Sequence, residues 1–302
     1  MSLPPLNPEV VKERVHNLAK LSTLPHIAVK VMELVENPRT SASSLAELIS
    51  ADQILAARIL KLANSAYYGF PRKISTLNLA IVVLGFNALR DLVLSISVIN
   101  RFVDENGEDF FQAEQFWRHA LIVGRGARLF SRYVNYPVAG EVFMAGLLHD
   151  IGYPVLLQQF PRHFAETCNF ARENNITFRA AENKILNFHH TDLGGWLARG
   201  WNLPDKLVSA IRYHHSPEDA SLHRDLVNII HISDRISFSI GEGSGLREKD
   251  EDSETEIAGT IAALFPHNNL PLEFFMSKFR EESEKIDDFL TILTQKEAVT
   301  TV

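Results

Sequence analysis

This chain of 302 residues has a single cysteine, no long apolar run and no excess of basic residues. A lone cysteine, Cys168, cannot form an internal disulfide, which favours a reducing compartment. No apolar run approaches the ~20 residues that span a bilayer, and the start, MSLPPLNPEV, lacks the charged and apolar regions of a signal peptide. We therefore expect a cytoplasmic protein with no membrane partner.

The charge balance is acidic. Lys and Arg number 30 against 37 Asp and Glu, so the formal net charge is -7. This balance offers no electrostatic footprint for a polyanion, and nucleic acid is not an expected partner. Hydrophobic residues make up 46% and charged residues 22%, which is enough apolar material to bury a large core. At ~150 residues per domain, the length predicts one large domain or two smaller ones.

Strand patterns are missing too, because no alternating β-branched runs are joined by hairpin turns. Apolar residues recur instead at helical spacing, as in Val11, Val15 and Leu18. Asn7 followed by Pro8 predicts the start of the first helix, with asparagine as the cap and proline in the first turn. The predicted fold class is all-α, a multi-helix bundle.

Capping residues predict further helix boundaries. Ser44 and Glu47 have the spacing of a capping box, and Asp52 can cap a helix that stops at Gly69. A longer helical stretch is predicted over 77–102. Later helices are predicted near 110–134, 138–149, 161–174, 177–189, 191–200, 204–214 and 225–240.

Two polar segments suggest internal boundaries. VDENGED at 103–109 is polar and contains glycine, and GEGSGLREKDEDSETE at 241–256 combines glycines with acidic charge. The tail after it returns to a helical pattern, with an apolar stripe of Phe279, Ile286 and Leu290. We expect four parts: an N-terminal helical half 1–105, a second helical half 106–240, an acidic flexible loop 241–256 and a helical tail 257–302.

Histidine and aspartate gather in the second half of the sequence. In GLLHDIG, His149 directly precedes Asp150, as two neighbouring ligands of one metal ion would. A helical bundle can aim such side chains at one interior point, and imidazole with carboxylate suits iron, manganese or zinc. One carboxylate can also bridge two ions. The candidate metal ligands are His119, His149, Asp150, His190, His214, His215 and Asp234.

Simpler interpretations stand beside these. A single His-Asp pair also forms an ordinary hydrogen bond at a helix end, and the chain has twelve histidines.

Arg118, Arg125 and Arg132 recur every seven residues with Arg128 nearby, which fits either a solvated helix face or contacts to phosphate. Asn64, Tyr67 and Tyr68 fit either a capped helix end or a partner-binding surface. The other histidines are interpreted as surface or packing residues: His16, His26, His163, His223, His231 and His267.

Motifs along most of the chain resemble the HDOD family, bacterial proteins related to the HD-domain phosphohydrolases. The resemblance covers about residues 15–240 and rests on ILKLANSAYYG, AIVVLGFNALRDLVLS, FWRHA, AGLLHDIGYPVL, HHTDLGGWLARGWNLPDKLVSAIRYHH and HISDRIS. It implies an all-α fold in which an N-terminal HDOD helical subdomain packs on an HD-like subdomain. It also implies a role in signal transduction through a protein partner, without demonstrated catalysis.

The related HD and HD-GYP enzymes use a binuclear metal centre with ligands in the order His, His-Asp, His, His-His, Asp. The resemblance assigns these positions to His119, the pair His149 and Asp150, His190, the pair His214 and His215, and Asp234. His190 is preferred to His189 because it precedes Gly194 by four residues, as in the family. Every ligand position is filled, which implies a pair of divalent ions such as iron, manganese or zinc.

Three departures weaken an enzymatic interpretation. Tyr153 replaces the lysine that meets substrate phosphate in HD-GYP enzymes, and HHSPEDA replaces their GYP signature. Gln115 stands where relatives with a third metal carry glutamate, and an amide is a poorer ligand for a hard cation. We expect a regulatory protein that binds metal and a signalling partner. The alternative is a metal-dependent phosphohydrolase whose phosphate-containing ligand is a nucleotide or a cyclic dinucleotide.

Overall fold

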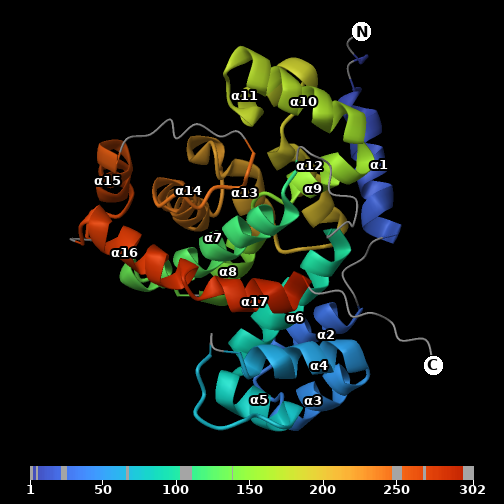
Figure 1. The fold of residues 1–302 in the computed structure, drawn as a ribbon, viewed down its shortest axis with the longest axis vertical. Helices are drawn as coiled ribbons and strands as arrows, with labels where there is room; N and C mark the ends of the chain where they lie inside the picture. Colours follow the sequence, from blue (N-terminus) through green and yellow to red (C-terminus); the bar gives the residue numbers. More distant parts are fainter. Residues whose placement is uncertain are drawn as a thin grey trace. The chain divides into compact units, whose positions relative to one another are not determined.

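The computed structural model describes residues 3–4, 6–21, 26–65, 68–102, 111–137, 139–246, 254–267 and 270–294. Throughout these ranges the chain forms α-helices and one short 3-10 helix, and it forms no strand (Figure 1). The prediction of an all-α protein is therefore confirmed. Tyr67, the 103–109 segment and residues 247–253 of the acidic loop lie outside the described residues.

The chain divides into two compact units, each built from separate stretches of sequence. Unit 1 comprises Met1–Thr23 and Asp104–Ser283, and unit 2 comprises Leu24–Val103 and Glu284–Val302. The expected parts 1–105 and 257–302 are thus each shared between the two units. Units assembled this way cannot be read from composition along the chain, because a helix joins the unit against which its apolar face packs.

Unit 1 holds most of the helices. Its elements are α1 (Pro8–Leu21), α7 (Ala113–Tyr133), α8 (Ala139–Leu148), α9 (Gly152–Gln159), α10 (Pro161–Asn174), α11 (Phe178–Ile185), α12 (His190–Gly200), α13 (Asp205–Tyr213), η1 (Pro217–Asp219), α14 (Arg224–Ser239), α15 (Glu254–Leu264) and α16 (Leu272–Ser283). The first helix starts at Pro8, and the Asn7 side chain accepts a hydrogen bond from the Glu9 backbone, as predicted.

Close glycine contacts bring the helices of unit 1 together. Gly146 of α8 lies against Gly124 of α7, where a Cβ on Gly146 would come within 2.5 Å of the Gly124 Cα. Gly152 at the start of α9 lies against the first residue of α12, where a Cβ would come within 1.9 Å of the His190 carbonyl oxygen. Side chains larger than hydrogen would force these backbones apart, so the glycines determine how closely the segments approach.

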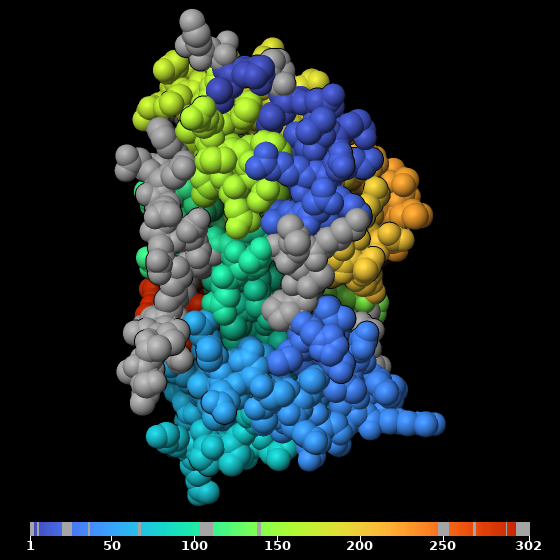
Figure 2. Space-filling model, turned by 90° about the vertical axis from the view of Figure 1, so that its right-hand side faces the viewer, coloured from blue at the N-terminus to red at the C-terminus, as the bar shows by residue number. Residues whose placement is uncertain are grey.

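The N-terminal segment packs on the outside of unit 1. α1 contacts α12, and Arg14 of α1 donates a hydrogen bond to Gln159 at 3.2 Å. Nearer the N-terminus, the Leu3 backbone N–H donates a hydrogen bond to the Glu166 carboxylate at 3.2 Å, and the Pro4 carbonyl oxygen lies 3.1 Å from Nε2 of His163 on α10. Figure 2 shows α1 (dark blue) beside α10 (yellow-green) on this face.

Unit 2 is a smaller helical bundle made of α2 (His26–Glu36), α3 (Ala42–Ser50), α4 (Gln53–Ala63), α5 (Leu77–Leu84), α6 (Phe86–Phe102) and α17 (Ile286–Thr294). Asp52 caps α4 as predicted, and its side chain accepts a hydrogen bond from the Leu55 backbone N–H at 2.9 Å. The expected stripe in the tail is buried but divided, because Phe279 belongs to α16 in unit 1 whereas Ile286 and Leu290 belong to α17.

Three predicted boundaries in unit 2 were wrong. The cap of α3 is Ser41, which accepts from the Ser44 backbone, so Ser44 and Glu47 lie inside the helix. α4 ends at Ala63 rather than Gly69, because the Asn64 side chain bonds both backbone groups of Ile74 at 2.8 Å and draws the chain away from the helix. The stretch 77–102 breaks at Gly85, which has a φ of 81° and separates α5 from α6.

Of the helices that the structure describes, none alone is long and apolar enough to cross a membrane. The pair α5 and α6 meets the length and composition requirements only when taken together, and the two helices are bent by 115° at their junction.

Candidate metal centre

All seven predicted ligands lie in unit 1, and the structure brings them together. His119 is in the middle of α7, His149 and Asp150 directly follow α8, and His190 begins α12. The remaining three are His214 and His215, which directly follow α13, and Asp234 on α14. Two groups result, one of Asp150, His190, His214 and His215 and the other of His119, His149 and Asp234, and within each group the ligand atoms lie within 4.8 Å of one another.

Helix ends orient two of the imidazole rings. Nδ1 of His149 lies 2.7 Å from the Gly146 carbonyl oxygen, and Nδ1 of His214 lies 2.9 Å from the Ile211 carbonyl oxygen. Each carbonyl belongs to the last turn of a helix, where it has no partner within the helix. A carbonyl can only accept, so Nδ1 carries the proton and Nε2 of the neutral ring presents a bare lone pair to the interior.

His119 and His190 are oriented in the same sense by other partners. Nδ1 of His119 lies 2.7 Å from the Glu242 carbonyl oxygen, in the segment that follows α14. Nδ1 of His190 lies 2.9 Å from Oε2 of Glu182, a buried carboxylate on α11. All four rings therefore turn Nε2 inward.

The inward atoms face each other at short range. Nε2 of His119 is 3.1 Å from Oδ1 of Asp234, and Nε2 of His149 is 3.2 Å from Oδ2 of Asp150. In the other group, Oδ1 of Asp150 is 3.2 Å from Nε2 of His190 and 3.3 Å from Nε2 of His214. Asp150 thus directs one oxygen to each group.

While the imidazole rings are neutral, these short contacts contain no hydrogen bond. With the Nδ1 protons committed elsewhere, an imidazole lone pair and a carboxylate oxygen are both acceptors. None of the Nε2 atoms of the five histidines has a hydrogen-bond partner, and neither do Oδ1 of Asp150 and Oδ1 of Asp234. Two ligands about 2.1 Å from one ion lie about 3.0 Å apart at a right angle and about 3.4 Å apart in tetrahedral geometry. The observed spacing therefore fits ligand atoms that surround a cation.

The pKa values show how strongly the cluster favours positive charge. Burial lowers the pKa of His149, but Asp150 and Asp234 outweigh burial and hold that pKa well above its usual value. Burial raises the pKa of Asp150, yet the neighbouring imidazoles hold it well below its usual range. At His214 and His215 burial dominates and the pKa is lowered. The buried carboxylates therefore stabilise positive charge in the cluster, supplied either by protons on the imidazoles or by metal ions.

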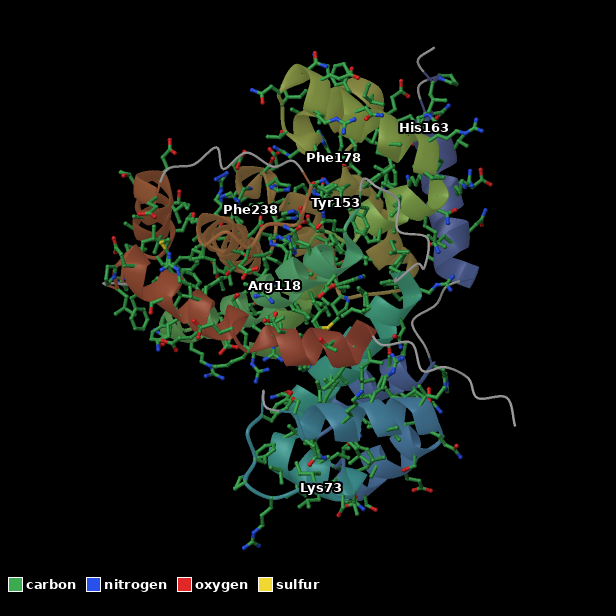
Figure 3. The ribbon with its side chains drawn as sticks, viewed as in Figure 1. Lys73, Arg118, Tyr153, His163, Phe178 and Phe238 are labelled. Atoms are coloured by element: carbon green, nitrogen blue, oxygen red, sulfur yellow. The ribbon has the colours of Figure 1, made fainter. Side chains whose placement is uncertain are left out.

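Aromatic side chains pack against two of the imidazole rings. Tyr153 is fully buried, and its ring stacks on His190 with centroids 3.9 Å apart. Phe238 of α14 packs against the His119 ring at 5.1 Å. Figure 3 labels both aromatic residues, and Tyr153 comes from α9. Where HD-GYP enzymes are expected to present a lysine, this chain therefore presents an aromatic wall.

The predicted arginine stripe is mostly engaged in ion pairs. Arg118 forms a paired hydrogen bond with the Glu242 carboxylate at 2.8 and 2.9 Å and also donates to Ser283. Arg125 lies 3.8 Å from Glu282, and its side chain is 11% exposed. The solvated-face interpretation is therefore wrong for these two residues. Gln115, at the third-metal position, is exposed, and its side-chain amide reaches the Gly243 carbonyl at 3.5 Å.

Glu182 and Glu242 were missed by the sequence analysis. Glu182 lies eight residues before His190 on the preceding helix, with no spacing rule to single it out. Glu242 binds His119 through its backbone oxygen, which every residue has, so the sequence cannot single this position out. His231, interpreted as a packing residue, also supports the site, because its Nδ1 lies 2.6 Å from the His214 carbonyl oxygen.

Comparison with known proteins identifies the family. The sequence model of the HDOD domain matches residues 21–217. An uncharacterised protein of Treponema pallidum (strain Nichols) is 25% identical over 229 residues, which is 74% of this chain and 44% of that protein. This chain therefore spans less than half the length of that relative.

Solved structures share the fold. An HDOD domain protein of unknown function from Geobacter sulfurreducens has a TM-score of 0.78 at 23% identity, covering 95% of this chain and 99% of its own. A protein from Shewanella amazonensis SB2B with the provisional name phosphohydrolase has a TM-score of 0.71 at 21% identity, covering 94% and 97%. One from Marinobacter aquaeolei VT8, provisionally named a signal transduction protein, has a TM-score of 0.77 at 21% identity, covering 95% and 65%. With the family model matching residues 21–217, this chain belongs to the HDOD domain family.

Proposed function

We propose that this chain is a cytoplasmic HDOD regulatory protein of signal transduction that holds two divalent metal ions and acts on a protein partner without turning over a substrate. The observation that carries the metal centre is the set of buried ligand atoms that face one another at 3.1–3.3 Å with no hydrogen-bond partner. Removing four imidazoles and two carboxylates from water without a cation would be costly.

Two ions are favoured over one because Asp150 points its oxygens at different groups. Oδ1 faces His190 and His214, whereas Oδ2 faces His149. A carboxylate that bridges two ions offers one oxygen to each in this way. The mixed nitrogen and oxygen ligands suit iron, manganese or zinc.

Burial favours a regulatory role over catalysis. His119, His149, His190 and His214 are fully buried, and Tyr153 stacks where a phosphate-binding lysine would be needed. A hydrolase needs an open coordination position and groups that neutralise phosphate. Arg118, the basic residue beside His119, is already neutralised by Glu242. The provisional name of the Marinobacter protein also supports a signalling role.

The alternative function is a metal-dependent phosphohydrolase acting on a nucleotide or cyclic dinucleotide. It is favoured by the complete ligand set and by the provisional name of the Shewanella protein. Metal ions in such a centre would lower the pKa of a bound water and supply a nucleophile.

A turnover assay separates the two functions. Metal-loaded protein is incubated with cyclic dinucleotides and with a generic phosphodiester, and the products are followed by chromatography. We expect no multiple turnover. Robust turnover that disappears in Asp150→Ala would establish the phosphohydrolase instead. A matched control is Asp205→Ala, since Asp205 is an exposed carboxylate in the first turn of α13.

A further inference from the structure

The two groups of ligands differ in the acceptors that bind the Nδ1–H of their histidines. His149 and His214 donate Nδ1–H to helix-end carbonyls, and His119 donates to the carbonyl of Glu242. His190 alone among these four rings donates to a charged carboxylate, that of Glu182. The group with His190 is called here the His190 subsite, and the group of His119, His149 and Asp234 the His119 subsite.

Glu182 is committed to His190 through both oxygens. Oε1 accepts the His190 backbone N–H at 2.8 Å, and Oε2 accepts the ring Nδ1–H at 2.9 Å. The carboxylate is fully buried, and His189 is a second, longer contact at 3.5 Å. No Lys or Arg ion pair to Glu182 occurs among the described residues. The negative charge of Glu182 therefore acts mainly on the His190 ring.

A carboxylate behind an imidazole changes that imidazole as a ligand. It draws the Nδ1 proton, raises electron density at Nε2 and holds the ring at a fixed angle, so that Nε2 binds a cation more tightly. A carbonyl acceptor fixes the ring but contributes no net charge.

Resting on the metal centre proposed above, we propose that Glu182 makes the His190 subsite the tighter of the two metal positions, so that this subsite is filled first and the His119 subsite second. Glu182 is then a positioning residue that does not touch the metal. The second, weaker position is the one whose occupancy follows the supply of metal. Its ligand His119 is held by Glu242, which also binds Ser283 at the end of unit 1.

The test is a titration of the metal-free full chain with Co²⁺ under anaerobic conditions, followed by visible absorption and calorimetry. We expect two steps in the wild type. Glu182→Gln keeps the shape and removes the charge, and it should weaken the first step roughly 10–100-fold while leaving the second unchanged. Glu182→Asp keeps the charge and should recover part of the affinity. Asp91→Asn removes a buried carboxylate in unit 2 and should change neither step.

A second measurement needs no variant. At one equivalent of Co²⁺, the paramagnetically shifted Nδ1–H signals in the NMR spectrum should come from His190 and His214. Signals from His119 and His149 should follow only at the second equivalent. Shifted signals from His119 first, or an unchanged first step in folded Glu182→Gln, would overturn the order proposed here. No Co²⁺ binding by the wild type would instead remove the metal centre itself, and with it this inference.

Discussion

In unit 2, Arg90 and Asp91 are both buried and pair with each other at 3.3 Å, whereas in unit 1 His119 and Asp234 approach to 3.1 Å with their facing atoms unsatisfied. Both units bury polar side chains inside helical bundles. In unit 2 a cation and an anion neutralise each other within the chain. In unit 1 the facing atoms of neutral imidazoles and carboxylates are all acceptors, so the neutralising charge has to come from bound protons or from a metal ion. This difference supports the metal centre proposed in unit 1.

Both units also expose some large apolar side chains. α5 in unit 2 is apolar on both sides: Leu77, Ala80 and Ile81 face the core, while Val82 is 70% exposed. In unit 1, Leu222 is 65% exposed, whereas Tyr153 is fully buried beside the candidate metal ligands. The experiments below test the metal centre, the helix packing and the exposed surface of the two units, beginning with the largest expected effect.

Metal removal should act strongly on unit 1. If free metal exceeds its dissociation constant about 1,000-fold, binding stabilises the folded state by about 4 kcal/mol. Chelation should then lower the melting temperature by about 10 °C, at 2–4 °C per kcal/mol for a unit of this size. The measurement is calorimetry with and without chelator. Asp150→Ala, which lacks the bridging carboxylate, should respond little, and equal shifts in both proteins would count against the metal centre.

The α7–α8 contact should be the next most sensitive feature. Gly146→Ala places a Cβ 2.5 Å from the Gly124 backbone and should lower the free energy of unfolding by about 2–3 kcal/mol. Gly259→Ala is the matched control, since its Cβ would meet nothing within 4 Å in exposed α15, and it should raise stability by ~0.5–1 kcal/mol. Urea unfolding followed by circular dichroism measures both. If both variants changed the free energy of unfolding in the same direction, the close approach of Gly146 to Gly124 would be unimportant.

Breaking the ion pair between Arg118 and Glu242, whose backbone oxygen binds His119, should lower the free energy of unfolding moderately. Arg118→Met removes the paired hydrogen bond to Glu242 and should cost about 1 kcal/mol, since both side chains are 21% exposed. The bond from Arg118 lowers the pKa of Glu242, with burial opposing and Ser283 assisting. The pair's stabilisation is therefore fully present above the unfolded pKa of glutamate and is lost as pH falls through the lower folded value.

Unfolding of wild type and Arg118→Met at a series of pH values tests this. The difference in unfolding free energy should be constant near neutral pH and shrink in the acid range below the ordinary pKa of glutamate. A difference that grows as the pH falls would contradict the assigned role of Glu242.

The smallest effect is expected on α5 of unit 2. Val82→Ser changes an exposed residue and should alter the unfolding free energy by less than about 0.5 kcal/mol. Ile81→Ser, one residue earlier and fully buried, should cost several times more. Comparable losses in the two variants, measured by urea unfolding, would show that Val82 is covered in the folded protein.

The sequence predicted what local rules determine. Helical periodicity gave the all-α class, and the side chains of Asn7 and Asp52 marked two helix starts. The break at Gly85 was missed because apolar residues continue on both sides of it, so periodicity alone does not reveal the bend. α9 was missed because it is short and follows the His-Asp pair directly.

The candidate site was predicted only in part for a related reason. The residues expected to bind metal occur in recognisable motifs, and the structure brings all of them together. The residues that hydrogen-bond to these ligands do not occur in recognisable motifs. Glu182 reaches His190 from another helix, and Glu242 supports His119 with a backbone oxygen across more than one hundred positions of sequence. Such partners depend on tertiary packing, which spacing along the chain does not encode.

Elemental analysis tests the central claim most directly. The full chain is purified without chelator, reconstituted anaerobically with iron, manganese or zinc, and freed of excess metal before analysis. The two ligand groups predict about two equivalents of transition metal per chain, falling to less than one in a His149→Ala, Asp150→Ala double variant that remains folded. Only trace metal in the reconstituted wild-type protein would contradict the metal centre.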